Sequence, residues 1–320
     1  MQSYDFFGSI SSLLHDGQLG VNVFFVISGF LITYLLLQEE EQNGHFSVMN
    51  FYKRRALRIF PAYYFLLLIF VLLDFLDFIW LSDPSYLTSF TFNKYFNYKR
   101  DWLTGHLWTL SVEIHFYILW PFILRKFKTQ RKQIAWSLFL IVPLVRLLLF
   151  FYPVDWILEY SFFTRMDAIV TGCLCAFYKD KLTSLFGAHG KYVFYVAVLS
   201  LFLLSYLDSL LSVYNFGLLY QFIGTTSGTI ANIMIGLILM FSIANETSVW
   251  YKFLTWRWVQ FLGTLSFSIY LWQQLFISKA GYWINVFPLN ILLIFLAAML
   301  SYYFVEKPFL RLKFKFKGDM

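Results

Sequence analysis

Long apolar segments recur along almost the whole 320-residue chain. A helix needs about 20 mostly apolar residues to cross a bilayer, and apolar types make up 59% of this chain while charged types make up 13%. The segments are apolar on all faces, which favours helices over barrel strands. The sequence therefore predicts an all-α, polytopic membrane helix bundle without a separate soluble domain. About nine transmembrane helices are expected, at residues 19–38, 60–80, 106–124, 134–152, 160–178, 192–211, 224–243, 258–278 and 286–304.

Lysine and arginine are distributed unevenly among the connections between these segments. Nineteen of them lie in one alternate set of connections, and only Lys94, Lys99, Arg100 and Lys279 lie in the other. Basic loops remain on the cytoplasmic side of a membrane, so the first set and the C-terminus are predicted to be cytoplasmic. The net charge of +7 thus reflects membrane orientation, and no nucleic-acid partner is expected. The cytoplasmic set consists of residues 39–59, 125–133, 179–191, 244–257 and 305–320.

Nine spans with a cytoplasmic C-terminus place the N-terminus outside the cell. Residues 1–18 contain neither a basic leader nor a separate apolar stretch, so they do not have the pattern of a signal peptide. A polar leader can cross a membrane without one. The simpler interpretation is that a first helix, running from inside to outside, is absent from this chain.

Two ionisable side chains, His106 and Glu113, lie in the third apolar segment. They are seven residues apart, a spacing that predicts a shared helical face. An ionisable residue inside a span is costly and is a functional candidate by default. A histidine and a carboxylate suffice for acid–base chemistry. The structural alternative is that Glu113 is a buried carboxyl bonded to a neighbouring helix.

A basic cluster precedes the second apolar segment and contains Arg54, Arg55 and Arg58. Arg55 and Arg58 are three apart and share a helical face, and Pro61 suits the first turn of a helix that starts near residue 60. One interpretation is a cytoplasmic anchor. The other is a phosphate clamp for an anionic ligand, because the guanidinium fork matches phosphate geometry. Composition does not choose between them.

Small side chains within the apolar segments favour close packing. Ser28 and Gly29 lie in mid-helix, where small residues let helices approach each other. Cys173 and Cys175 are one residue apart, too close for an unstrained disulfide, and no partner ligands for zinc accompany them. They are predicted to be packing residues, and no metal site is expected.

Two further polar groups have a structural and a functional interpretation. Arg165 and Asp167 are two apart and do not face each other on a helix, so each is predicted to pair with another helix. Ser266, Tyr270 and Gln273 recur at helical spacing. Their polar stripe is predicted to face other helices or a water-filled cavity.

Six motifs follow one another along nearly the whole chain, at 20–32, 51–61, 107–121, 165–172, 262–272 and 306–309. Together they resemble the acyltransferase 3 family of integral membrane O-acyltransferases. The resemblance implies a single domain over residues 1–320. It also implies transfer of an acetyl or other short acyl group from cytoplasmic acyl-CoA to a hydroxyl of a cell-envelope glycan or lipid-linked sugar, in the bacterial inner membrane.

The resemblance implies roles for the candidate residues as well. Arg54, Arg55 and Arg58 would hold the phosphates of acyl-CoA, whereas His106 and Glu113 would position the acceptor or relay a proton. Family members are ten-helix bundles whose first helix carries an arginine and an essential histidine, and the chain shows no such helix. It also has glutamine where many members have histidine after Tyr-Leu-Trp. Structural or positioning roles would fall to Ser28, Ser111, Arg165, Asp167, Ser266, Tyr270 and Gln273.

Two other functions stay open. A transporter or flippase for an anionic sugar lipid would also use intramembrane Glu113, Arg165 and Asp167, but it predicts inverted repeats and interrupted helices, which the sequence does not show. An inactive partner subunit is the third interpretation, and the missing first helix favours it.

Overall fold

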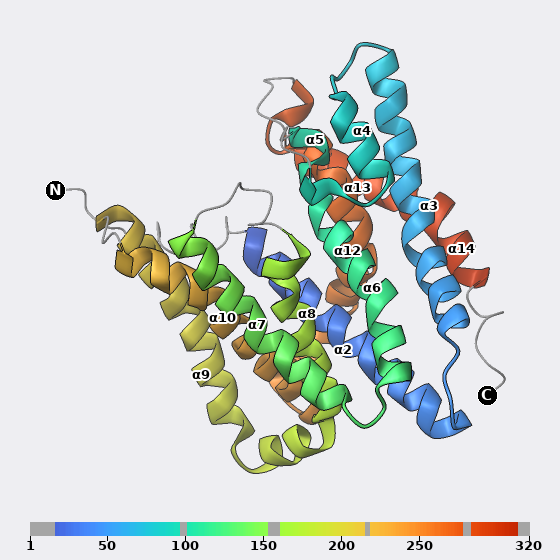
Figure 1. Cartoon of the computed structure of the whole chain (residues 1–320). Coiled ribbons are helices and arrows are strands. Elements are labelled where there is room, and N and C mark those ends of the chain that lie inside the picture. Colours follow the sequence, from blue (N-terminus) through green and yellow to red (C-terminus); the bar gives the residue numbers. More distant parts are fainter. Residues whose placement is uncertain (1–16, 97–100, 153–160, 215–217, 278–282, 313–320) are drawn as a thin grey trace. The chain divides into compact units, whose positions relative to one another are not determined.

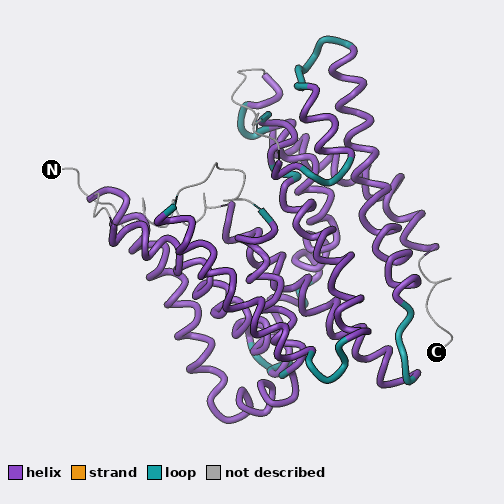
Figure 2. The backbone as a smooth tube through the Cα atoms, viewed as in Figure 1, coloured by secondary structure: helices purple, strands orange, loops and turns teal. Residues whose placement is uncertain are grey.

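The computed structural model describes residues 17–96, 101–152, 161–214, 218–277 and 283–312. Within these ranges every regular element is a helix (Figures 1 and 2). Residues 1–16 of the polar N-terminal segment lie outside these ranges, and so do Lys99, Arg100 and Lys279. The elements in chain order are α2 (Gly17–Asn43), α3 (Val48–Phe75), α4 (Asp83–Phe90), η1 (Lys94–Phe96), α5 (Trp102–Gly105), α6 (Trp108–Lys126), α7 (Arg131–Phe151), α8 (Phe162–Phe177), α9 (Lys179–Tyr214), α10 (Leu218–Ala244), α11 (Val249–Leu254), α12 (Arg257–Phe276), η2 (Trp283–Asn285), α13 (Leu289–Leu300), η3 (Ser301–Glu306) and α14 (Lys307–Leu312).

Seven helical stretches among the described residues are long and apolar enough to cross a membrane. This confirms an all-helical, polytopic membrane protein. The stretches are Gly17–Asn43, Val48–Phe75, Trp102–Lys126, Arg131–Phe151, Gly190–Leu207, Ile223–Ala244 and Leu289–Leu312.

The other two predicted segments form helices that are not among the seven, for two physical reasons. Helix α8 has 16 residues, or about 24 Å at 1.5 Å per residue, which is less than the roughly 30 Å of bilayer hydrocarbon. Helix α12 has 20 residues, but glutamine, serine and threonine side chains are scattered along it. These polar residues lower its mean hydropathy.

Helix α3 differs most from its sequence prediction. It begins at Val48 rather than near residue 60, so the arginine cluster belongs to its first turns and Pro61 lies in its interior. The Ser47 hydroxyl caps it by accepting a hydrogen bond from the Asn50 amide at 3.2 Å. The helix ends at Phe75, because Asp74 bonds the chain that follows it. The Asp74 carboxylate accepts hydrogen bonds from the Leu81 amide at 2.9 Å and from the Tyr86 hydroxyl.

The chain forms two compact units, and the first contains residues 1–46 and 123–252. Helix α8 is its centre, since every residue from Met166 to Ala176 is buried. Helix α2 crosses α8 closely at Gly29 and Gly172, as the small residues predicted. Cys173 and Cys175 are buried and free, which confirms their packing role. At the end of α2, the Glu40 carboxylate accepts hydrogen bonds from Nη1 and Nη2 of Arg131 in α7, at 2.5 and 3.1 Å.

The second unit contains residues 47–122 and 253–320. Its long helices are α3, α6 and α12, together with a last helix in which α13 passes through the π-helical turn η3 into α14. The short helix α4 is fixed to α3 by the Tyr63 hydroxyl, which donates to the Ser89 carbonyl at 2.7 Å. Four of the six motifs that resemble the acyltransferase 3 family lie in this unit.

Candidate functional site

The basic cluster of α3 lies beside aromatic side chains rather than in a loop. The guanidinium carbon of Arg55 is 5.2 Å from the ring centroid of Tyr117 and 5.5 Å from that of Phe51, within cation–π range. The Tyr52 hydroxyl donates to the Ile118 carbonyl at 2.7 Å and joins α3 to α6. Aromatic contacts therefore orient Arg55 inside the unit, which a simple membrane anchor does not require.

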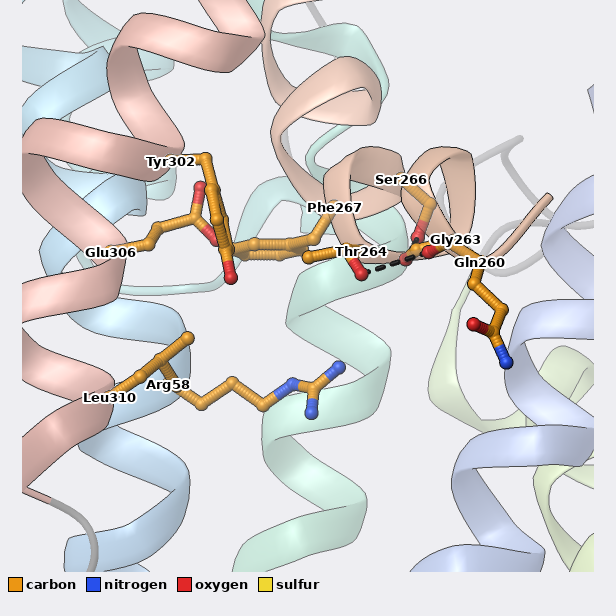
Figure 3. A pocket seen from close by; sticks show the side chains of 9 residues that line it. All are labelled: Arg58, Gln260, Gly263, Thr264, Ser266, Phe267, Tyr302, Glu306 and Leu310. Carbon is orange, nitrogen blue, oxygen red and sulfur yellow. Dashed lines mark hydrogen bonds between the residues drawn. The ribbon is translucent and has the colours of Figure 1, made fainter. Parts of the chain in front are cut away.

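A cavity of about 390 Å³ lies beside Arg58 in the second unit. This volume falls within the range of about 300–1,000 Å³ that is usual for small-molecule sites. In Figure 3 the Arg58 side chain extends from α3 into the space below the α12 residues. The cavity therefore combines the Arg58 guanidinium, a group suited to an anion, with hydroxyl groups and the Glu306 carboxylate. Its lining residues are Arg58, Gln260, Gly263, Thr264, Ser266, Phe267, Tyr302, Glu306 and Leu310.

Glu306 brings a carboxylate to the same cavity. It is 5% exposed and accepts a hydrogen bond from the Ser268 hydroxyl of α12. The π-helical turn Ser301–Glu306 presents it, and such turns occur often at functional sites. Sequence reasoning included Glu306 in a motif but gave it no role, because a glutamate next to a lysine near the end of a span has the pattern of an ordinary surface pair.

Glu113 is buried in α6, as predicted for an intramembrane carboxyl. It is 2% exposed, and its Oε1 atom accepts a hydrogen bond from the Tyr117 hydroxyl one turn along the same helix. Since the Tyr117 ring also contacts Arg55, Tyr117 lies between the carboxylate and the α3 cluster. Ser111, on the same helix, accepts from the Lys94 backbone amide at 3.2 Å.

His106 lies in the turn between α5 and α6, two residues before α6 begins. Its ring is buried, and Nε2 donates to the Leu271 carbonyl of α12 at 3.2 Å. The structure thus gives His106 and Glu113 different partners, although the sequence places them one heptad apart. The backbone carbonyl of His106 accepts a hydrogen bond from the Tyr270 hydroxyl, which also contacts Thr109 Oγ1.

The polar stripe of α12 contacts two different parts of the second unit. Ser266 lines the cavity and donates to the Gly263 carbonyl at 2.8 Å. Tyr270, one turn further, bonds α12 to the turn before α6. Gln273 is half-buried beyond it. The stripe therefore faces both a cavity and a neighbouring element, the two alternatives that its spacing allowed.

Lys94 was expected to be an outer loop charge, but it is 4% exposed. Its Nζ donates to the Ser85 hydroxyl at 2.8 Å. Burial lowers the pKa of Lys94 to about 8, although nearby Asp101 acts in the opposite direction. No hydropathy pattern marks this residue, because a lysine in a short polar connection is normally solvated.

The lowered pKa of Lys94 predicts a rise in stability with pH. The unfolded state binds a proton up to about pH 10.4, whereas the folded state releases it near pH 8. Between these values the unfolded chain carries more protons, so the free energy of unfolding increases with pH. Melting temperatures of the detergent-solubilised protein should rise from about pH 7.5 to about pH 9.5. Lys94→Met should reduce that slope, and an unchanged slope would contradict the assignment.

In the first unit, Asp167 of α8 forms the interhelix pair that its position in the sequence predicted. It is 2% exposed, pairs with Arg146 of α7, and accepts from the Thr229 hydroxyl of α10 at 2.8 Å. Arg146 lies 21 positions from Asp167, and nothing in the sequence connects the two residues. Arg165 is half-buried near the start of α8, and Ser28 is buried on α2.

A family model for the acyltransferase domain of the acyltransferase 3 family matches residues 2–305. The chain belongs to the acyltransferase 3 family. Its match to O-acetyltransferase OatA of Staphylococcus aureus strain NCTC 8325 is 28% identical and covers 94% of this chain and 54% of that protein. Its match to the peptidoglycan O-acetyltransferase OatA of Listeria monocytogenes EGD-e is 25% identical and covers 91% and 51%.

This acyltransferase 3 member thus spans about half the length of the curated relatives it matches. No solved structure matches the chain. Within the described parts of the chain, no group of three or more histidine, cysteine, aspartate or glutamate side chains is placed to hold a metal ion.

Proposed function

We propose that this acyltransferase 3 member is a membrane O-acetyltransferase that moves an acetyl group from cytoplasmic acetyl-CoA to a hydroxyl of a cell-envelope glycan. Family membership supports the reaction class, and the names of the relatives support acetyl as the group and peptidoglycan as an acceptor. The single structural observation that carries the proposal is the cavity beside Arg58. A guanidinium beside a polar cavity suits a phosphorylated donor.

The donor side of the reaction follows from the proposed topology. The predicted cytoplasmic position of the basic connections, in one domain over residues 1–320, puts the start of α3 and the start of α12 on the cytoplasmic side of the bacterial inner membrane. Arg54, Arg55 and Arg58 then meet the phosphates of acetyl-CoA where it enters. Ser266 and Gln260 of α12 line the same cavity as Arg58.

The acceptor side lies toward the other end of the same unit. His106 and Glu113 lie along the path from the outer surface to the α3 cluster, where they would position the acceptor hydroxyl or relay its proton. Ser28, Ser111, Arg165, Asp167, Ser266, Tyr270 and Gln273 keep positioning or structural roles. A glycan or a lipid-linked sugar would bind from the outer leaflet.

The decisive experiment supplies radiolabelled acetyl-CoA to the cytoplasmic face of membranes that contain the protein. We expect label in the glycan fraction as an ester that mild base releases, because O-acetyl groups are alkali-labile. Both a flippase and an inactive partner subunit predict no such label. If these membranes gain no more base-labile label than membranes that lack the protein, the proposal is contradicted.

Substitution of Arg58 tests the donor site directly. Arg58→Ala removes a charged hydrogen bond to phosphate, a contact worth about 1.5–3 kcal/mol. We expect the KM for acetyl-CoA to rise about 10- to 100-fold. Lys53→Ala removes a cation from the same stretch of α3 that does not line the cavity, and it should leave KM nearly unchanged. Equal KM values for both variants and the wild type would exclude Arg58 as a phosphate ligand.

A further inference from the structure

His106 has a ring nitrogen whose state is defined by its partner. Nε2 lies 3.2 Å from the Leu271 carbonyl oxygen, and a carbonyl can only accept, so Nε2 carries the proton. In the neutral ring Nδ1 then holds an unprotonated lone pair. Tyr270 reinforces this arrangement, because its hydroxyl bonds the His106 carbonyl and its ring centroid lies 5.2 Å from the imidazole centroid.

The Nδ1 atom of His106 is buried and has no hydrogen-bond partner among the described residues. The side chain is 8% exposed, so bulk water does not replace that partner. Two more buried polar atoms nearby in sequence share this property, Thr104 Oγ1 and Trp272 Nε1. Thr104 precedes His106 by two residues, and Trp272 follows the residue that His106 contacts. An unsatisfied buried polar group costs about 1–3 kcal/mol, so the unpartnered Nδ1 atom of His106 is a candidate contact for a polar ligand.

The junction is within reach of the cavity along α12. Phe267 lines the cavity and Leu271 is four residues further on, a rise of about 6 Å. From Gln260, which lines the cavity with Arg58, to Leu271 the rise is about 16 Å. An extended pantetheine arm covers that distance, so a donor held by Arg58 can present its thioester next to His106.

We propose that His106 is the general base of the acyl transfer, acting through Nδ1 on an acceptor hydroxyl bound at the α5–α12 junction. This assignment rests on the proposed acetyltransferase function. Nδ1 takes the hydroxyl proton while the acceptor oxygen bonds to the thioester carbonyl carbon. The carbon–sulfur bond then breaks, and the proton on Nδ1 passes to the departing sulfur. An ester and a free thiol result, His106 returns to its neutral form, and no further reactant is needed.

The test replaces His106 by glutamine, whose amide nitrogen can still donate to the Leu271 carbonyl but which has no basic lone pair. We expect kcat to fall about 100- to 10,000-fold, the usual contribution of a general base, with the KM for acetyl-CoA and the thermal stabilisation by CoA unchanged.

His115→Gln is the matched control. His115 lies on α6, and its Nδ1 already has a partner, the Tyr95 hydroxyl at 2.8 Å, so kcat should stay within about threefold of the wild type, well short of the loss expected for a base. His106→Asn, which keeps a polar atom near the Nδ1 position, should lose activity like His106→Gln, and it replaces that variant if CoA no longer stabilises it.

A His106→Gln protein that folds, binds CoA and keeps its kcat would overturn this assignment and leave the acetyltransferase proposal intact. A wild-type protein that neither binds CoA nor forms acetyl esters would overturn both.

Discussion

Alanine at Gly29 or Gly172 is expected to prevent stable folding of the first unit. A Cβ atom on Gly29 would lie 2.7 Å from the carbonyl carbon of Ile169 and closer still to its oxygen. A Cβ atom on Gly172 would lie 2.5 Å from the Phe30 amide nitrogen and would overlap the Val26 carbonyl. These neighbours are backbone atoms, so relief requires the two helices to separate. Overpacking usually costs about 1–3 kcal/mol, and we expect each variant to reach at least the top of that range.

Gly20→Ala is the matched control, because Gly20 lies on the same helix as Gly29 and a Cβ atom added there would meet nothing within 4 Å. Alanine there should be neutral or stabilising by up to about 1 kcal/mol. Melting temperature and monodisperse yield after detergent extraction measure the difference. A loss of about 3 kcal/mol corresponds to roughly 4–5 °C at this chain length, because the unfolding entropy is about 2.1 cal/mol/K per residue. Variants at Gly29 or Gly172 with the same melting temperature as Gly20→Ala would disprove the close crossing of α2 and α8.

The helices were predictable because their signal is local. About twenty apolar residues in a row give a span whatever surrounds them, and Ser28 with Gly29 indicated close packing before any partner was known. Helix α3 was predicted to start too late because hydropathy marks where a helix enters lipid, whereas the helix itself starts at a cap. Ser47 and the helix-forming residues after it start α3 at Val48, well before the predicted apolar segment.

The candidate site was predictable only in part because its contacts are distant in sequence. Glu113, His106 and Arg58 are unusual residues for an apolar chain, so they could be identified one by one. Their partners could not, since His106 bonds a backbone carbonyl 165 residues away and a carbonyl has no residue type to recognise. Lys94 was assigned to a solvated loop because burial depends on how α4 and η1 fold back against α3. Glu306 could be placed beside the cavity only from the structure, in which the π-helical turn Ser301–Glu306 presents it.

Removal of Arg146 is the second change with a large expected effect on stability. Its guanidinium pairs with Asp167 and also donates to Thr229 Oγ1 at 3.0 Å and to the Thr225 carbonyl at 3.2 Å. Arg146→Met leaves the Asp167 carboxylate buried without its cation, and breaking a buried pair in this way costs about 3–5 kcal/mol. We expect a lower melting temperature and a poor yield of folded protein.

The double variant Arg146→Met/Asp167→Leu shows how much of the loss in Arg146→Met comes from leaving the Asp167 carboxylate buried without a cation. Replacing both charges by apolar groups of similar volume is often neutral, so the double variant should melt well above Arg146→Met. The resulting coupling energy should be about 1–3 kcal/mol. Acetyl transfer, normalised to folded protein, should be unchanged in the double variant, because the pair holds α7, α8 and α10 together and no donor or acceptor contact is assigned to it. A transporter that recognises an anionic sugar through these charges would instead lose its function with them, even in a stable double variant. The double variant therefore tests whether intramembrane charge in the first unit serves the fold or a substrate.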